Sequence, residues 1–283
     1  MNNFDFLVIG SNGLLGSRVV NSLKKKNLSF LTIARKNSNF NLNLENFKKI
    51  SYFFSKNRFK IVVNCAAIID IKYCEENFNN SKIINCKLVK FLSQMSKKFG
   101  FKFVQISTDH VYKGLKPSLN KETSKIFAIN KYARSKILAE KYLINLKKFL
   151  IIRTNFTGKK SNSFLEWLID GIKKKKKMYL FNDMYTSTID VDRCAKIIIE
   201  LALLKSKGIY NLGTRNMISK EKFAINLSKI LKKKIQYDSV SCDIQKIPRG
   251  KNLGLDVKKI EKKLGYKMPT SRQSIISLAR EYR

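Results

Sequence analysis

Tyr132 and Lys136 are the two residues whose types and spacing most directly suggest chemistry in this sequence. They are four positions apart in a segment with helical periodicity, so both side chains are expected on one helix face. A phenol has a reference pKa of about 10 and transfers a proton poorly at neutral pH unless a nearby cation stabilises its phenolate. The ammonium of Lys136, one helical turn away, would supply that cation. This spacing is common in a lysine-rich chain, so the pair needs support from other motifs.

That support comes from the polar stretch Ser107 to Tyr112, which follows the fourth predicted strand. It should therefore lie at the carboxyl edge of a sheet, where a hydroxyl can donate to a substrate carbonyl. A reduction requires such a donor, because oxyanion character develops on the carbonyl oxygen. Taken alone, the same residues would also fit a turn or a helix cap. We expect His110, the single histidine, to be a packing or hydrogen-bonding group.

A glycine-rich loop precedes a helix near the N-terminus, with Gly10, Gly13 and Gly16 in the sequence GSNGLLG. Gly10 permits a tight turn, Gly13 lets the backbone approach a pyrophosphate, and Gly16 lets the helix pack closely on the preceding strand. The glycine triplet could be only a turn. Its position between a predicted strand and a predicted helix favours a dinucleotide-binding loop.

The end of the second predicted strand bears on which dinucleotide binds. An acidic residue there would bind the ribose 2′-hydroxyl of NAD. Here the strand runs into Arg35 and Lys36 with no carboxylate nearby, which suits the 2′-phosphate of NADP. The sequence therefore favours NADPH, with NADH as the alternative.

The elements that must position these residues alternate between short apolar runs and longer helix-period segments. This pattern predicts an α/β fold, a Rossmann-type doubly wound parallel sheet with a smaller mixed α/β C-terminal substrate domain. The dinucleotide-binding domain is predicted over 1–155, and the substrate-binding region over 156–283 with some segments returning to the first domain. The predicted strands are Phe6–Ile9, Leu28–Ala34, Lys60–Asn64, Phe101–Ile106 and Phe149–Arg153, and the helices between them are Leu14–Lys25, Ser81–Phe99 and Ala128–Lys147.

The second part is predicted to contain scattered helices and two short strands. The helices are expected over Phe164–Lys175, Arg193–Leu204, Lys220–Leu231 and Ser271–Arg280, and the strands over Met178–Phe181 and Gly208–Leu212. No apolar run approaches the roughly 20 residues needed to span a bilayer, and no secretory signal is apparent. We therefore expect a cytoplasmic protein without a membrane partner.

The most unusual feature of the composition is the formal charge of +38, from 58 Lys and Arg against 20 Asp and Glu. It suggests a binder of nucleic acid or anionic membranes. The lysines are scattered, however, and Gly and Pro are scarce, as expected for an AT-rich coding sequence. No nucleic-acid partner is therefore expected. The lysine runs at 24–26, 173–177 and 232–234 are the places where such binding would be located. Five cysteines without a CxxC pair predict free thiols and no metal site.

Together, the motifs resemble the extended short-chain dehydrogenase/reductases, and most closely their dTDP-4-dehydrorhamnose reductase group. The resemblance covers nearly the full length. It rests on GSNGLLG at 10–16, NCAA at 64–67, STDHVYKG at 107–114, the Tyr132 and Lys136 pair, RTN at 153–155, TIDVDRCAK at 188–196, GIYNLG at 208–213 and the segments 248–256, 258–260 and 264–266.

The resemblance implies a role for each matching residue. Tyr132 would protonate the C4 oxygen of a keto-sugar nucleotide, and Lys136 would lower the tyrosine pKa and hold the nicotinamide ribose. Thr108 would bind the carbonyl oxygen and Asp109 would orient the substrate or the tyrosine. The remaining implied contacts are Gly10, Asn12, Gly13, Leu14, Leu15, Gly16, Arg35, Lys36, Ala66, Ala67 and Asn85 for the cofactor, and Asn155 and Arg249 for the substrate, with Arg249 on its pyrophosphate and Arg153 at the mouth between the domains.

The implied activity is NADPH-dependent reduction of the 4-keto group of a nucleotide-activated deoxysugar for cell-surface polysaccharide. A homodimer is compatible with the resemblance. The chain departs from the family at Ile68 and Ile69, where a Tyr-Thr pair is common, and at 133–135, where Gly-Lys-Thr is usual. The alternatives are an NAD-dependent epimerase or dehydratase, a non-catalytic NADP-binding regulatory module, and a nucleic-acid binder. A dehydratase would require a glutamate near Asp109, where His110 stands instead.

Overall fold

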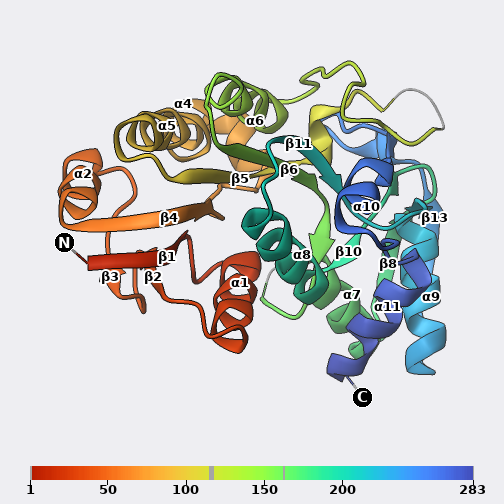
Figure 1. The fold of residues 1–283 in the computed structure, drawn as a ribbon. Helices are drawn as coiled ribbons and strands as arrows, with labels where there is room; N and C mark the ends of the chain where they lie inside the picture. The colour runs from red at the N-terminus through yellow and green to blue at the C-terminus, as the bar shows by residue number, and fades with distance from the viewer. Residues whose placement is uncertain (1, 115–117, 162, 283) are drawn as a thin grey trace. The chain divides into compact units, whose positions relative to one another are not determined.

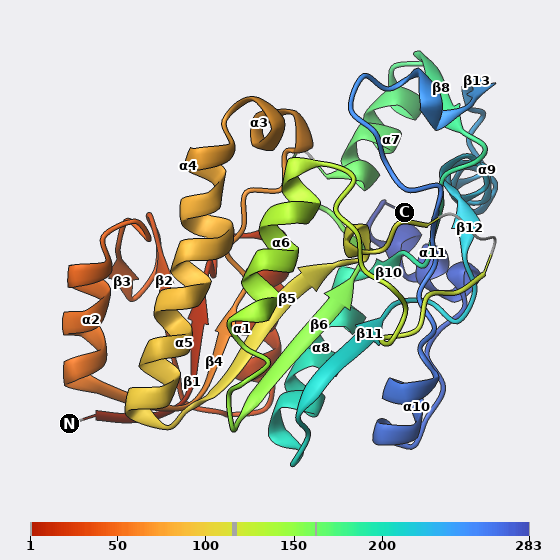
Figure 2. The same ribbon diagram turned by 90° about the horizontal axis from the view of Figure 1, so that it is seen from above.

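A seven-stranded sheet organises the N-terminal part of the protein in a computed structural model that describes residues 2–114, 118–161 and 163–282. The strand order is β11-β6-β5-β4-β1-β2-β3, and Figure 2 shows β1, β4, β5, β6 and β11 lying side by side in this sequence. The pairs β1–β2, β1–β4, β4–β5 and β2–β3 run parallel. The predicted α/β fold with a Rossmann-type doubly wound sheet is confirmed.

The strands alternate with helices in a doubly wound pattern. Figure 1 shows α2, α5 and α6 on one face of the sheet and α1 and α8 on the other. The strands are β1 (Asn2–Ile9), β2 (Phe30–Ala34), β3 (Phe40–Asn41), β4 (Asn57–Asn64), β5 (Lys102–Thr108), β6 (Phe149–Thr154) and β11 (Gly208–Leu212). The helices are α1 (Leu14–Lys25), α2 (Phe47–Lys56), α3 (Ile71–Glu76), α4 (Phe78–Lys82), α5 (Leu88–Phe99), α6 (Lys131–Lys141) and α8 (Val191–Leu203), with a π-helical turn, η1, at Ile83–Lys87.

Burial on both faces explains why the central strands are continuous apolar runs. The run Phe6 to Ile9 is fully buried, as is the run Leu150 to Ile152 in β6. Such strands are typical of parallel sheets, which helices cover on both faces. The strand order reverses between β1 and β4, and ligands of doubly wound sheets bind outside the carboxyl ends of the strands at this switch point.

The chain divides into two compact units that interleave along the sequence. The first comprises 1–108, 130–153 and 195–210, and the second comprises 109–129, 154–194 and 211–283. The short segments 109–129 and 195–210 thus belong to different units from the residues that flank them. The strand β11, Gly208–Leu212, is part of the large sheet.

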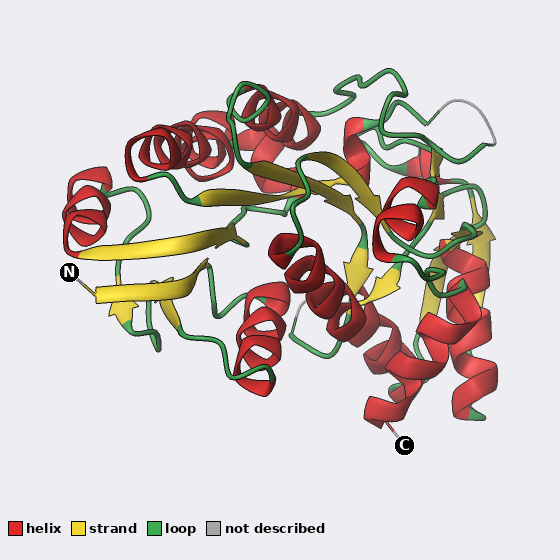
Figure 3. Ribbon diagram, viewed as in Figure 1, coloured by secondary structure: helices red, strands yellow, loops and turns green. Residues whose placement is uncertain are grey.

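Within the described residues, the second unit contains three small sheets together with helices. Figure 3 colours the helices red and the strands yellow. Its core is an apolar cluster built on α7, α9 and α11, which includes Leu168, Phe223 and Ile275. Its elements are η2 (Asp109–Val111), β7 (Phe156–Thr157), α7 (Phe164–Lys173), β8 (Lys177–Phe181), β9 (Tyr185–Thr186), β10 (Ile189–Asp190), β12 (Ile218–Ser219), α9 (Lys220–Leu231), β13 (Gln236–Val240), η3 (Cys242–Ile244), β14 (Asn252–Leu253), α10 (Lys258–Leu264), α11 (Ser271–Ala279) and η4 (Arg280–Tyr282).

Several elements differ in their bounds from the sequence-based prediction, and three of these differences lie near the predicted site residues. Helix α6 begins at Lys131 rather than Ala128, because the side chain of Asn130 accepts a hydrogen bond from the backbone N–H of Ala133 and caps the helix. It ends at Lys141 and is followed by turns. Strand β5 extends through Thr108, so this residue is the last of the strand. The predicted helix Ser81–Phe99 is interrupted by the π-helical turn η1. Among the described helices, none combines the length and apolar character needed to cross a membrane.

Candidate active site

The glycine-rich loop lies at the switch point of the sheet, directly after β1. Gly10 has a φ of +78°, a conformation that side chains disfavour. A Cβ atom at this position would lie 2.7 Å from the backbone nitrogen of Ala66, which follows β4. Gly10 and Ala66 therefore bring the ends of β1 and β4 into backbone contact, and this contact requires glycine at position 10.

The start of α1 is held against the same loop. A Cβ atom on Gly16 would overlap the carbonyl oxygen of Gly10. Gly13 is the N-cap residue of the helix and provides no side-chain cap, and the first turn contains no acidic residue. The backbone N–H groups of Leu14 and Leu15 are in this turn, where the helix dipole favours an anion. The loop and helix thus form a backbone cradle that fits a pyrophosphate.

The end of β2 is tied to this loop through Asn12, whose side-chain amide donates to the carbonyl oxygen of Lys36. Arg35 and Lys36 are both exposed. The nearest acidic residue that follows them in the chain is Glu45. Two cations without a neighbouring carboxylate at this strand end suit a 2′-phosphate better than a free ribose hydroxyl.

Tyr132 and Lys136 lie in the first turns of α6 and are both buried, with exposed fractions of 8% and 3%. The Nζ atom of Lys136 donates to the carbonyl oxygen of Ile106 in β5, at 2.7 Å. Burial lowers the pKa of Lys136 to about 8, and the nearby carboxylate of Glu140 partly opposes this shift. The ammonium is thus anchored to the sheet and lies one helical turn from the tyrosine.

Asn85 lies in the π-helical turn η1 and is almost completely buried. Its side chain accepts from the backbone N–H of Ile68 at 2.8 Å, and donates to the Ile68 carbonyl at 2.9 Å and to Ser135 Oγ at 3.1 Å. Ser135 in turn donates to the carbonyl oxygen of Tyr132. The side chain of Asn85, which the resemblance assigns to the cofactor, therefore holds the loop after Ala66 and Ala67 against α6. Ile69, in this loop, is 71% exposed.

Arg153 was expected at the mouth between the domains, but the structure places it in a buried ion pair with Glu140. Its Nη2 lies 2.7 Å from Glu140 Oε2, and both side chains are 3% exposed. Ser107 Oγ donates to the other carboxylate oxygen at 2.5 Å. Glu140 therefore joins α6 to β5 and β6 and lies one turn beyond Lys136. Glu140 was not predicted from the sequence, although its spacing of four residues from Lys136 places both side chains on one face of a helix.

Thr108 and Asp109 are consecutive, at the end of β5 and the start of η2, and both are buried. The side chain of Asp109 accepts a hydrogen bond from Asn155 Nδ2 at 2.8 Å. The Asn155 carbonyl oxygen accepts from Thr188 Oγ1 at 2.9 Å. The polar atoms of Asn155, predicted to contact the substrate, thus engage Asp109 and Thr188.

Asp109 and three basic side chains of the second unit, His110, Lys220 and Arg249, form a group that interacts electrostatically. Asp109 and Arg249 both act electrostatically on Lys220, whose pKa burial lowers to about 8. The pKa of His110 is also lowered, chiefly by burial and further by the charges of Arg249 and Lys220. Arg249, predicted from the sequence to bind pyrophosphate, is therefore part of a cationic cluster. Thr188, in the loop before β10, and Lys220, the first residue of α9, were not singled out from the sequence, because each is a common residue type in an ordinary position.

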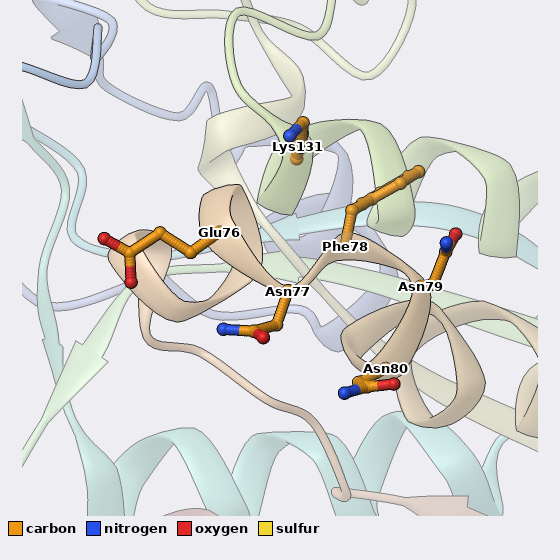
Figure 4. A pocket seen from close by; sticks show the side chains of 6 residues that line it. All are labelled: Glu76, Asn77, Phe78, Asn79, Asn80 and Lys131. Carbon is orange, nitrogen blue, oxygen red and sulfur yellow. The ribbon is translucent and has the colours of Figure 1, made fainter.

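An open hollow of about 470 Å³ lies on the surface formed by α3, α4 and the start of α6. Figure 4 shows its lining residues, Glu76, Asn77, Phe78, Asn79, Asn80 and Lys131. Lys131 directly precedes Tyr132, but its Nζ donates to the carbonyl oxygen of Glu75. None of the residues predicted to bind cofactor or substrate lines this hollow.

Comparison with known proteins identifies a matching family. The model of the RmlD substrate binding domain matches residues 4–283. The chain is 27% identical over 216 residues to dTDP-4-dehydrorhamnose reductase of Salmonella typhimurium, covering 74% of this chain and 72% of that protein. It is 26% identical over 220 residues to the spore coat polysaccharide biosynthesis protein SpsK of Bacillus subtilis, covering 77% and 76%. A crystal structure of dTDP-4-dehydrorhamnose reductase from Bacillus anthracis in complex with NADP superposes with a TM-score of 0.91 at 23% identity, covering 99% of this chain and 100% of that one.

Proposed function

Because this chain belongs to the RmlD substrate binding domain family, we propose that it is an NAD(P)-dependent reductase of a 4-keto sugar nucleotide. The observation that carries this proposal is the combination, within one unit, of a backbone cradle at Gly10 to Gly16 and the buried pair of Tyr132 and Lys136. The relatives named dTDP-4-dehydrorhamnose reductase and SpsK support a role in sugar synthesis for polysaccharides.

NADPH is the proposed cofactor, with NADH as the alternative. The chain fits a dinucleotide at two points: the cradle at the start of α1, and the exposed Arg35 and Lys36 at the end of β2. When bound, the dinucleotide would supply a hydride to the keto carbon, and this chemistry belongs to the cofactor. The related Bacillus anthracis structure contains NADP.

In the proposed mechanism, Tyr132 Oη delivers a proton to the oxygen of the reduced carbonyl. The Lys136 ammonium stabilises the phenolate that remains, and its hydrogen bond to the Ile106 carbonyl fixes its position. Thr108 donates a hydrogen bond to the same substrate oxygen, where negative charge develops. Asp109, the next residue, would orient the substrate with its carboxylate, which accepts a hydrogen bond from Asn155 Nδ2.

Recognition of the sugar nucleotide is assigned to the second unit. Arg249 would bind the pyrophosphate, because its planar guanidinium can bind two phosphate oxygens at once. Asn155 would contribute by holding Asp109. The nucleotide base and the configuration produced at C4 depend on residues that the motifs do not define.

The test is NADPH oxidation by the purified protein with a panel of dTDP-, UDP- and GDP-linked 4-keto sugars. We expect turnover with at least one of them, and a loss of about 100-fold or more in kcat for Tyr132→Phe, since positioned acid catalysis contributes on that order. Tyr142→Phe, at the end of the same helix and 38% exposed, is the matched control and should retain activity.

Two other outcomes would replace the proposal. Interconversion of sugar nucleotides without net NADPH oxidation would indicate an epimerase or dehydratase. No turnover with any substrate, together with unchanged cofactor and ligand binding by Tyr132→Phe, would indicate a non-catalytic binding module.

A further inference from the structure

A continuous chain of hydrogen bonds in the second unit joins Lys220 to Asp109. Lys220 Nζ donates to Thr188 Oγ1 at 3.4 Å, Thr188 Oγ1 donates to Asn155 Oδ1 at 2.9 Å, and Asn155 Nδ2 donates to Asp109 Oδ2 at 2.8 Å. The chain therefore begins at an ammonium and ends at a carboxylate. It links the start of α9 to η2, about 110 residues away in the sequence.

The donor and acceptor roles along this chain are fixed by hydrogen-bond capacity. A threonine hydroxyl has one proton to donate and two lone pairs that accept. Because Thr188 gives its proton to Asn155, it must accept from both Lys220 and Thr186, whose Oγ1 lies 2.8 Å away. Every link then runs in one direction, from the positive end to the negative end. Hydrogen bonds aligned in this way polarise and strengthen one another.

The position of Lys220 is electrostatically unfavourable for the fold itself. It is the first residue of α9, where the helix dipole is positive and disfavours a cation. Burial further disfavours its charged form. The ring of Phe164, 4.5 Å from Nζ, offers one compensating contact. Helix stability therefore does not explain an ammonium here, whereas a partner in the network does.

The charged groups that face Lys220 are Asp109 from η2 and Arg249 from the segment before β14. The pKa of His110, also in η2, is lowered chiefly by burial, which favours its uncharged form. With Lys220 and Arg249 as cations and Asp109 as the anion, the cluster carries a net charge of about +1. This charge suits an anionic ligand such as the pyrophosphate of a sugar nucleotide.

We propose that Lys220 is a positioning residue that fixes the carboxylate of Asp109 through Thr188 and Asn155 and so sets the affinity for the sugar nucleotide. This inference rests on the proposed function, because Asp109 is assigned there to orient the substrate. Lys220 acts on the substrate through the hydrogen bonds that join it to Asp109 and through its own positive charge. A sugar nucleotide is the ligand class for which this role is expected.

The kinetic test compares two substitutions of equal shape. Thr188→Val removes the two links that the Thr188 hydroxyl makes, to Lys220 and to Asn155, whereas Thr186→Val, two residues away in the same unit, leaves all three links in place. We expect Thr188→Val and Lys220→Met each to raise the KM for the sugar nucleotide roughly tenfold or more, since hydrogen bonds to charged groups are lost. The KM for NADPH should stay unchanged, and Lys220→Arg should restore most of the affinity. Equal KM values for Thr188→Val and Thr186→Val would overturn the proposal.

A second measurement does not depend on activity. The coupling between Lys220→Met and Asp109→Asn in urea unfolding is measured in the wild-type, Thr188→Val and Thr186→Val backgrounds. The coupling should fall with Thr188→Val and persist with Thr186→Val. Coupling of the same size in both backgrounds would overturn the role of the chain. If Lys220 and Asp109 couple through Thr188 as expected but no keto-sugar nucleotide is reduced, the proposed function is wrong and the role of the hydrogen-bond chain is still supported.

Discussion

The buried ion pair between Glu140 and Arg153 predicts a large loss of stability for Glu140→Gln. Glu140 Oε1 lies 2.5 Å from Ser107 Oγ and 3.1 Å from Arg153 Nε, and Oε2 lies 2.7 Å from Arg153 Nη2. Glutamine keeps the shape but removes the charge and places an N–H donor against a donor. Both side chains are 3% exposed, so water cannot replace the lost partner.

The expected magnitude follows from the burial of the remaining guanidinium. Removing one partner of a buried pair costs about 3–5 kcal/mol, because an uncompensated charge is left in the interior. A typical protein has a total unfolding free energy of only about 5–15 kcal/mol. The variant should therefore unfold at a much lower urea concentration than the wild type, followed by circular dichroism.

Glu76→Gln is the matched control for this experiment. It breaks the Lys72–Glu76 pair, whose side chains are 78% and 60% exposed and whose charged atoms are 3.9 Å apart. Such a pair contributes at most about 0.5 kcal/mol, since water screens both charges. The double variant Glu140→Leu with Arg153→Met removes both buried charges and should recover much of the stability lost by Glu140→Gln. Equal losses of less than about 1 kcal/mol for Glu140→Gln and Glu76→Gln would refute the reasoning.

Three further predictions concern the glycine-rich loop, the residues after β2 and Lys136, in the roles proposed for them above. Gly10→Ala should weaken NADPH binding and lower the unfolding free energy by more than Gly265→Ala does. Both residues have a φ of +78°, but only a Cβ at Gly10 would meet a backbone neighbour. Urea unfolding and NADPH titration measure the two effects, and equal losses of stability in the two variants would contradict the prediction. The double variant Arg35→Ala with Lys36→Ala should raise the KM for NADPH by about 10-fold or more and leave the KM for NADH nearly unchanged. Alanine at the exposed Lys25 and Lys26 is the control and should change neither KM value. A parallel rise of both KM values would exclude a 2′-phosphate contact. The value of kcat/KM should fall as pH rises through about 8, where Lys136 loses its proton. The unfolding free energy should rise over the same pH range, because Lys136 in the unfolded chain, with a pKa of about 10.5, keeps the proton that the folded protein releases. A fall in kcat/KM together with a fall in the unfolding free energy would instead indicate that the protein unfolds.

Local interactions made much of the fold readable from the sequence. The helix Lys220–Leu231 and the helix Leu14–Lys25 have the predicted bounds, because caps and apolar periodicity are properties of neighbouring residues. Where a boundary was wrong, another interaction set it. Asn130 caps α6, so the helix begins at Lys131, three residues after the predicted start at Ala128. The π-helical turn η1 has no sequence signal of its own, because the same residues fit an ordinary α-helix.

The candidate site shows the same division. The glycine loop and the Tyr132 and Lys136 pair are contiguous motifs, so their spacing predicts their geometry. His110 is half-buried and burial disfavours its charged form, while its role as a packing or hydrogen-bonding group stays a prediction. The sequence could not show that Arg153 pairs with Glu140, because that contact depends on how α6 packs across β5 and β6.

The sequence by itself determined the order of strands and helices, the cradle after β1 and the spacing of the tyrosine and lysine, because each depends on residues within one or two turns. Only the tertiary structure decided which distant groups meet. The strand order brings Gly10 against Ala66 at the switch point. The packing of α9 near η2 brings Lys220 into a chain that ends at Asp109. These contacts depend on strand order and packing between distant segments, and no local pattern in the sequence specifies them.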